Sequence, residues 1–230
     1  MATAARRAIL ALVLFGAAFG YLEAAVVAYL RLLHEPARQR FHPGRSTGEL
    51  FPLLTLDQLR DAGPQQTTIL RIEIGREAAT ILMLAAVALA VSNNAGEWLA
   101  AFALAFGVWD IAFYLFLRLL LGWPASLLTW DILFLIPLPW VGPVLAPVAV
   151  SAAMAAAGVW HLTGAVHLNA VHWLGIVVGG ALIIVSFTLD CRGILSGGMP
   201  PPFHWGVFTA GLSLGFASYA TSKLSRKRRQ

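Results

Sequence analysis

Residues 97–121, EWLAAFALAFGVWDIAFYLFLRLLL, decide the fold of this chain. Between Glu97 at the start of this run and Arg118 near its end, Asp110 is the one charged residue. A helix of about 20 predominantly apolar residues is long enough to cross the hydrocarbon core of a bilayer. The run therefore predicts a transmembrane helix with a carboxylate near its middle.

The rest of the chain has the same apolar character. Of its 230 residues, 59% are hydrophobic and only 12% are charged, and the mean hydropathy is +0.75. Soluble domains carry about 25% charged residues. The composition excludes an ordinary soluble domain and predicts an all-α, polytopic membrane helix bundle.

Working outward from this run, apolar segments and polar breaks predict a single transmembrane domain, residues 1–230, with about six crossings. The crossings are expected at about 8–32, 67–91, 97–121, 126–161, 169–190 and 204–222. An outer polar loop at 34–66 is expected to contain a short surface helix at 55–61.

The fourth segment is too long for one straight crossing at about 1.5 Å per residue. Prolines interrupt it at Pro137, Pro139, Pro143 and Pro147. We expect it to be proline-broken or re-entrant, either as a kinked helix or as a half-helix at 126–136 followed by a crossing at 144–161. Broken backbone at membrane depth is tolerated where it is buried in protein or lines a wet cavity. A cavity is therefore expected beside Asp131 and Pro137.

The net charge of +5 comes largely from the two ends of the chain. Basic residues cluster there at Arg6, Arg7, Lys223, Arg226, Lys227, Arg228 and Arg229. Basic residues beside apolar helices are typical of cytoplasmic ends resting on anionic lipid. We therefore expect both termini in the cytoplasm, membrane lipids as partners and no nucleic acid. The single cysteine, Cys191, excludes an intrachain disulfide.

Small residues recur at helical spacing in three of the crossings. The pairs are Gly16 and Gly20, Gly175 and Gly179, and Gly211 and Gly215. Helices in lipid associate where small residues let their backbones approach. These stripes predict helix contacts rather than chemistry.

Charged residues inside the crossings are the most informative feature, because each costs about 2.5 to 3.5 kcal/mol at a helix centre. They fall between the middle of the bilayer and its outer boundary when the termini are cytoplasmic. The expected ligand-binding residues of the resulting cavity are Glu23, Glu73, Arg76, Glu77, Asp110, Tyr114 and Asp131. We expect no metal and no cofactor, and we assign no catalytic residue.

Other motifs leave alternatives open. Ser213 lies in a GxSxG pattern that would need His172 as its base to act as a nucleophile. His161, His167 and His172 cluster in sequence without the spacing of an established ligand set. Glu73, Arg76 and Glu77, with the loop 42–48, contain ingredients of a lipid-phosphate hydrolase.

The stretches FGYLEAAVVAYLR, IEIGREAAT, GVWDIAFY and GWPASLLTWDILFLIPLPWVGPVLAP resemble a family of bacterial multi-pass membrane proteins with no assigned activity. They cover about half of the chain. The resemblance implies a bacterial inner (plasma) membrane protein and implies no catalytic role.

The sequence thus favours a membrane protein whose carboxylate and arginine cavity, within the first four segments, binds a polar solute, an ion or a lipid head group. One alternative is a non-catalytic subunit of a larger membrane complex, whose partners are other membrane subunits or further copies of this chain. The other is a membrane-embedded lipid-phosphate hydrolase. In the subunit alternative, the small-residue helices at 169–190 and 204–222 would form the docking face.

Overall fold

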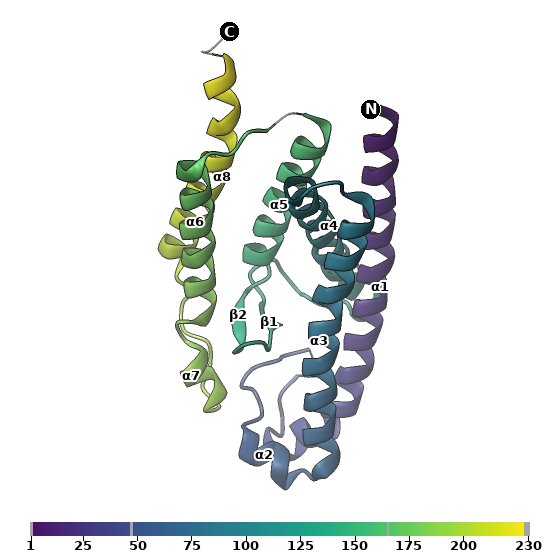
Figure 1. Ribbon diagram of the computed structural model, residues 1–230. Helices are drawn as coiled ribbons and strands as arrows, with labels where there is room; N and C mark the ends of the chain where they lie inside the picture. The colour runs from purple at the N-terminus through teal and green to yellow at the C-terminus, as the bar shows by residue number, and fades with distance from the viewer. Residues whose placement is uncertain (1, 47, 165, 228–230) are drawn as a thin grey trace.

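The computed structural model describes residues 2–46, 48–164 and 166–227 (Figure 1). The described elements are α1 (Ala2–Phe41), α2 (Leu56–Asp61), α3 (Pro64–Val91), α4 (Ala95–Leu121), β1 (Trp130–Phe134), β2 (Trp140–Pro143), α5 (Leu145–Thr163), α6 (Ala170–Thr188), α7 (Cys191–Leu195) and α8 (Trp205–Lys227). The long helices lie alongside one another, and both ends of the chain lie at the same end of the bundle (Figure 1). We call this end the terminal end.

Five described segments are long and apolar enough to cross a membrane. They are Thr3–Phe41, Pro64–Val91, Ala95–Leu121, Leu145–Thr163 and Ala170–Leu195. The expected last crossing is helical, as α8, but its glycine, serine and threonine residues make it less apolar, and it is not among the five. The fold is therefore an α-helical membrane bundle, and a sixth crossing by α8 stays a prediction.

The first helix is longer than the predicted crossing at 8–32. It continues through Pro36 to Phe41, and its last turns carry Arg38 and Arg40. Gln39 donates a hydrogen bond of 2.7 Å to Glu35 one turn earlier. This polar extension follows the apolar part of α1, and it is part of the outer loop region.

The outer loop packs against this extension at the end of the bundle opposite the termini (Figure 1). Its short helix, α2, confirms the helix expected at 55–61, and Thr55 and Gln58 cap it reciprocally. Arg40 donates to the backbone carbonyl of Asp61 at 3.3 Å. His34 of α1 lies 2.6 Å from the side-chain oxygen of Gln66, so the loop and the starts of the helices form one cap.

The fourth segment has its expected structure only in part: α5 matches the crossing expected at 144–161, whereas the half-helix expected at 126–136 is wrong. Residues 126–136 form no half-helix; β1 and β2 make an antiparallel two-stranded hairpin with Asp131 opposite Gly142, and α5 follows. Prolines remove backbone donors and are unfavourable inside a helix. Strand pairing satisfies part of the remaining donors, and β2 is packed against α6 and α5. The expectation of a broken, buried segment is thus correct, but its structure is β rather than α.

Glycine contacts join the helices in pairs. A Cβ atom on Gly20 of α1 would lie 2.7 Å from the Trp109 carbonyl oxygen of α4. One on Gly179 of α6 would lie 2.6 Å from the carbonyl oxygen of Gly211 in α8. Such approaches have no room for a side chain, which confirms the predicted role of the small-residue stripes.

Candidate functional site

A small cavity lies between α1, α3, α4 and the strand β1. Its volume is about 70 Å³. Its lining residues are Glu23, Val27, Glu73, Arg76, Glu77, Thr80, Trp109, Asp110, Phe113, Tyr114, Ile132, Leu133 and Phe134. Six of the seven residues that the sequence placed at one depth therefore meet at one cavity. Their binding of a ligand stays a prediction.

Helical spacing aims the acidic side chains at this cavity. Glu23 follows Gly16 and Gly20 on the face of α1 that packs on α4, so its side chain is only 4% exposed. Glu77 and Thr80 share the buried face of α3 with Glu73. Asp110 lies on the buried face of α4 with Tyr114 one turn later.

Arg76 is the cation of the cavity, and two carboxylates bind it. It forms an ion pair with Glu23 across the α1–α3 contact and a second with Glu73 on its own helix. Its Nε atom donates to Glu73 at 2.9 Å. Thr80 donates to the other oxygen of Glu23. The guanidinium is thus held between two helices, and its hydrogen bonds are directed at protein carboxylates.

Glu77 links α3 to the hairpin. Its carboxylate accepts a hydrogen bond of 2.8 Å from the backbone N–H of Leu135, directly after β1. A backbone donor at a hairpin turn has no strand partner, and leaving it unpaired in a buried place costs about 1–3 kcal/mol. Glu77 therefore stabilises the turn of the hairpin from a neighbouring helix.

The two aspartates of the repeated Trp-Asp-Ile sequence take different partners. Asp110, in α4, accepts a hydrogen bond of 2.8 Å from Ser151 of α5. Asp131, in β1, accepts one of 2.9 Å from the Tyr114 hydroxyl. Asp131 is buried, but it lies behind Tyr114 and does not line the cavity. Pro137 is likewise not among the lining residues, so the cavity lies beside β1 rather than beside the proline turn.

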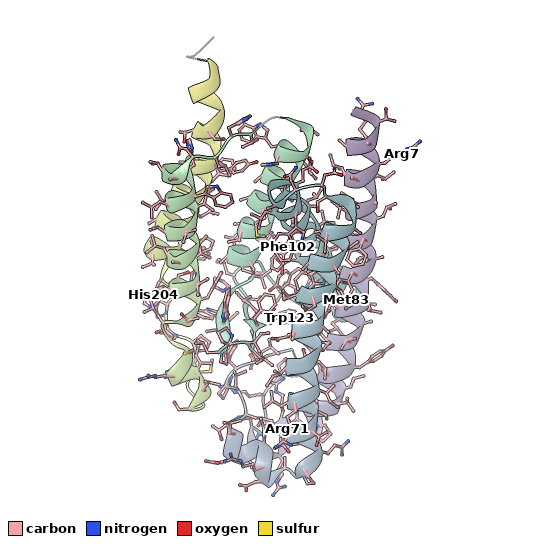
Figure 2. All side chains as sticks on the ribbon, in the orientation of Figure 1. Arg7, Arg71, Met83, Phe102, Trp123 and His204 are labelled. Carbon is pink, nitrogen blue, oxygen red and sulfur yellow. The ribbon has the colours of Figure 1, made fainter. Side chains whose placement is uncertain are left out.

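Arg31 is a charged residue that the sequence did not assign to the site. Its guanidinium carbon lies 3.9 Å from the centre of the Trp123 ring, and its charge acts on Asp131. Its Nε atom is buried without a hydrogen-bond partner. Arg118, in contrast, donates to the carbonyl oxygens of Gly122 and Pro124 and ends α4. Arg71 is exposed near the end opposite the termini (Figure 2).

The site holds more acid than base. Five carboxyl groups, from Glu23, Glu73, Glu77, Asp110 and Asp131, lie near two guanidinium groups, from Arg31 and Arg76. Unpaired buried charge is costly, and proteins reduce the cost by adding protons or counter-ions.

The size and geometry of the cavity limit what it binds. A water molecule occupies about 30 Å³, so the cavity has room for about two. In the part of the chain that the structure describes, no group of three His, Cys, Asp or Glu side chains is arranged to hold a metal ion. The arrangement suits water and protons better than a solute or a coordinated metal.

The polar partners were the part of the site that sequence reasoning missed. Thr80 shares a helix face with Glu73 and Glu77, which is a usable signal. Ser151 lies in an alanine-rich helix, and the Leu135 N–H belongs to the backbone, so neither carries a sequence signal.

The register of α6 and α8 separates Ser213 from His172. Gly179 contacts Gly211 and Gly215, which places Ser213 at its level. His172 lies seven residues earlier, about 10 Å along the helix axis. The ring of His172 accepts a hydrogen bond of 3.2 Å from the Asn169 N–H in a capping box. The structure therefore does not bring this pair together.

No protein-family model, curated protein or solved structure matches this chain. The class of protein consequently follows from the fold alone. In the described residues, five helices are long and apolar enough to cross a bilayer, and glycine contacts pack α1 and α5 on α4 and α6 on α8. These features define an α-helical membrane protein.

Proposed function

We propose that this protein is a multi-pass membrane protein whose buried carboxylate cavity binds and releases protons, as the ion site of a transport-like function. The observation that carries the proposal is the excess of four carboxyl groups, from Glu23, Glu73, Glu77 and Asp110, over one arginine, Arg76, in the lining of a cavity the size of about two water molecules. Ionisable groups inside membrane segments mark ion and proton pathways in general.

The hairpin gives proton binding a mechanical consequence. Glu77 of α3 accepts a hydrogen bond from the Leu135 N–H just after β1. Tyr114 of α4 donates a hydrogen bond to Asp131, which lies in β1. A proton on Glu77 weakens its acceptor strength, because a carboxylate accepts a stronger hydrogen bond than a carboxylic acid does. Protonation would therefore loosen the hairpin from α3, and this movement would widen the cavity.

A polar solute or a lipid head group would need that wider state, since the described cavity has too little volume for either. A phosphate would also compete with Glu23 and Glu73 for Arg76. This competition gives the hydrolase alternative no support. The subunit alternative is less favoured, because Gly179 of α6 and Gly211 of α8 pack against each other instead of facing a partner.

Location and orientation are part of the same proposal. We place the protein in a bacterial inner membrane, with lipids as its partners and the terminal end in the cytoplasm. The basic residues at both ends of the chain support this orientation by the positive-inside rule.

Infrared difference spectroscopy of the purified protein tests the proposal. Between acidic and alkaline buffer, the stretching band of protonated carboxyl groups should change, and Glu77→Gln and Asp110→Asn should each remove part of the change. The matched control is Glu35→Gln, which alters an exposed carboxylate at a helix extension. An identical protonated band in the unmodified protein and both cavity variants would overturn the proposal.

A further inference from the structure

A second cavity, separate from the carboxylates, lies between α4, α5, α6 and α8. Its volume is about 440 Å³, and its lining is predominantly apolar. Phe102 of α4 lies on this side of the bundle (Figure 2). Leu99, Trp173 and Phe216 line the cavity and are each about 40% exposed or more, so it is accessible from outside the bundle.

The cavity runs along the helix axes from the terminal end to the middle of the bundle. On α5 its lining extends from Val150 to His161, and on α8 from Gly211 to Tyr219. At about 1.5 Å per residue the α5 stretch is about 16 Å long. This is close to half of the roughly 30 Å hydrocarbon thickness of a bilayer, the depth of one leaflet.

Two glycines keep this cavity open. A Cβ atom added to Gly180 or Gly215 would meet nothing within 4 Å, although both residues line the cavity. Neither glycine is needed for a close helix contact at its own Cβ position, and glycine is unfavourable in a helix interior relative to alanine. The absence of a side chain at these two glycines therefore enlarges the cavity and does not bring two helices closer together.

Apolar cavities of this kind do not hold water, and leaving one empty destabilises the fold. If a methylene group takes up about as much space as a water molecule, ~30 Å³, the cavity accommodates about fifteen of them. Its size, length and lining thus match one alkyl chain of a membrane lipid.

Charge complementarity indicates the type of lipid head group. In the sequence, Lys223, Arg226 and Lys227 follow Tyr219, which lines the cavity. Arg7 also lies at the terminal end (Figure 2). The carboxylate of Glu97 is near the same end, but it accepts two hydrogen bonds of 2.9 Å from Asn93. The chain that follows the cavity lining at the terminal end is therefore basic in sequence, which favours an anionic head group.

We propose that the α4–α5–α6–α8 cavity binds one alkyl chain of an anionic phospholipid from the leaflet at the terminal end. The alkyl chain occupies the apolar cavity, and the phosphate lies at the terminal end, where the basic stretch of the sequence follows Tyr219. This binding is independent of the carboxylate cavity and of proton binding.

Native mass spectrometry of the full chain, titrated with phosphatidylglycerol, tests the proposal. Gly180→Phe and Gly215→Phe place a side chain in the open volume and should each weaken binding of one lipid at least about tenfold, or about 1.4 kcal/mol. Ala86→Phe, on an exposed face of α3, is the control and should leave lipid binding unchanged.

Thermal unfolding without added lipid shows whether the variants fold, and the filled cavities should leave the midpoint unchanged or raised. Equal lipid binding by folded Gly180→Phe and Gly215→Phe would overturn the proposal. Equal affinity for phosphatidylcholine would also overturn it, since the proposal requires an anionic head group. The triple change Lys223→Gln, Arg226→Gln and Lys227→Gln should abolish the preference for phosphatidylglycerol.

Discussion

Two regions of this bundle associate by different means. In the polar region, formed by α1, α3, α4 and the hairpin, ion pairs and hydrogen bonds join the elements around a cavity. In the glycine pair, formed by α6 and α8, residues 173–188 and 205–222 contain no Asp, Glu, Lys or Arg. There the backbones touch at Gly179 and Gly211. The pair needs only close packing, whereas each charged group of the polar region depends on partners from other elements.

Among these variants, removal of the Arg76 side chain should destabilise the protein most, because it disrupts the polar region. Arg76→Ala leaves Glu23 and Glu73 buried without their cation, and breaking a buried ion pair costs about 3–5 kcal/mol. Thermal unfolding in detergent measures the loss. Arg71→Ala removes an exposed arginine from the same helix and should change the stability by less than about 0.5 kcal/mol. Similar losses in both variants would mean that the ion pairs do not stabilise the bundle.

Neighbouring glycines of α6 allow a matched test of the glycine pair. In Gly179→Leu the new side chain collides with the backbone of α8, which should cost about 1–3 kcal/mol. In Gly180→Leu the side chain enters open space, so the stability should be unchanged or higher. Chemical denaturation of the two variants compares them. A loss in Gly180→Leu as large as that in Gly179→Leu would contradict the register of α6 on α8.

A smaller effect is expected where the polar region holds the hairpin. Glu77→Ala leaves the Leu135 N–H without an acceptor, at a cost of about 1–3 kcal/mol, whereas Glu77→Gln retains an acceptor and should lose less. Hydrogen exchange at the hairpin turn should become fastest in the alanine variant and rise by less in the glutamine variant, whose neutral acceptor resembles that of the protonated carboxyl group. The same exchange rate in both would argue against this contact.

Labelling with a membrane-impermeant maleimide changes no interaction and determines how both regions are oriented. Cys191 lies in α7, at the end of the bundle opposite the termini (Figure 1). In intact cells it should react from outside. In a Cys191→Ala background, a cysteine introduced by Thr3→Cys should react only after permeabilisation. The reverse pattern would place the terminal end outside.

The sequence predicted the helices and much of the cavity. The length of each apolar segment and the positions of costly charged residues within it can both be taken directly from the sequence. Glu23, Glu73, Glu77 and Asp110 could be placed because helical spacing fixes their faces and depth. The hairpin could not be predicted, because short apolar runs interrupted by proline have no period that separates strand from helix. Trp109–Asp110 lies in a helix and Trp130–Asp131 in a strand, although the two sequences are nearly the same.

Helix α1 continues to Phe41, about 14 Å past the predicted end of its crossing at residue 32. The polar end of α1, α2 and the outer loop together form a folded extension at one end of the molecule only. In a nanodisc this folded extension would protrude from the membrane on one side of a 24.7 kDa particle that is otherwise mostly embedded. It offers an epitope for an antibody fragment, and hence a reference mark for aligning single-particle images.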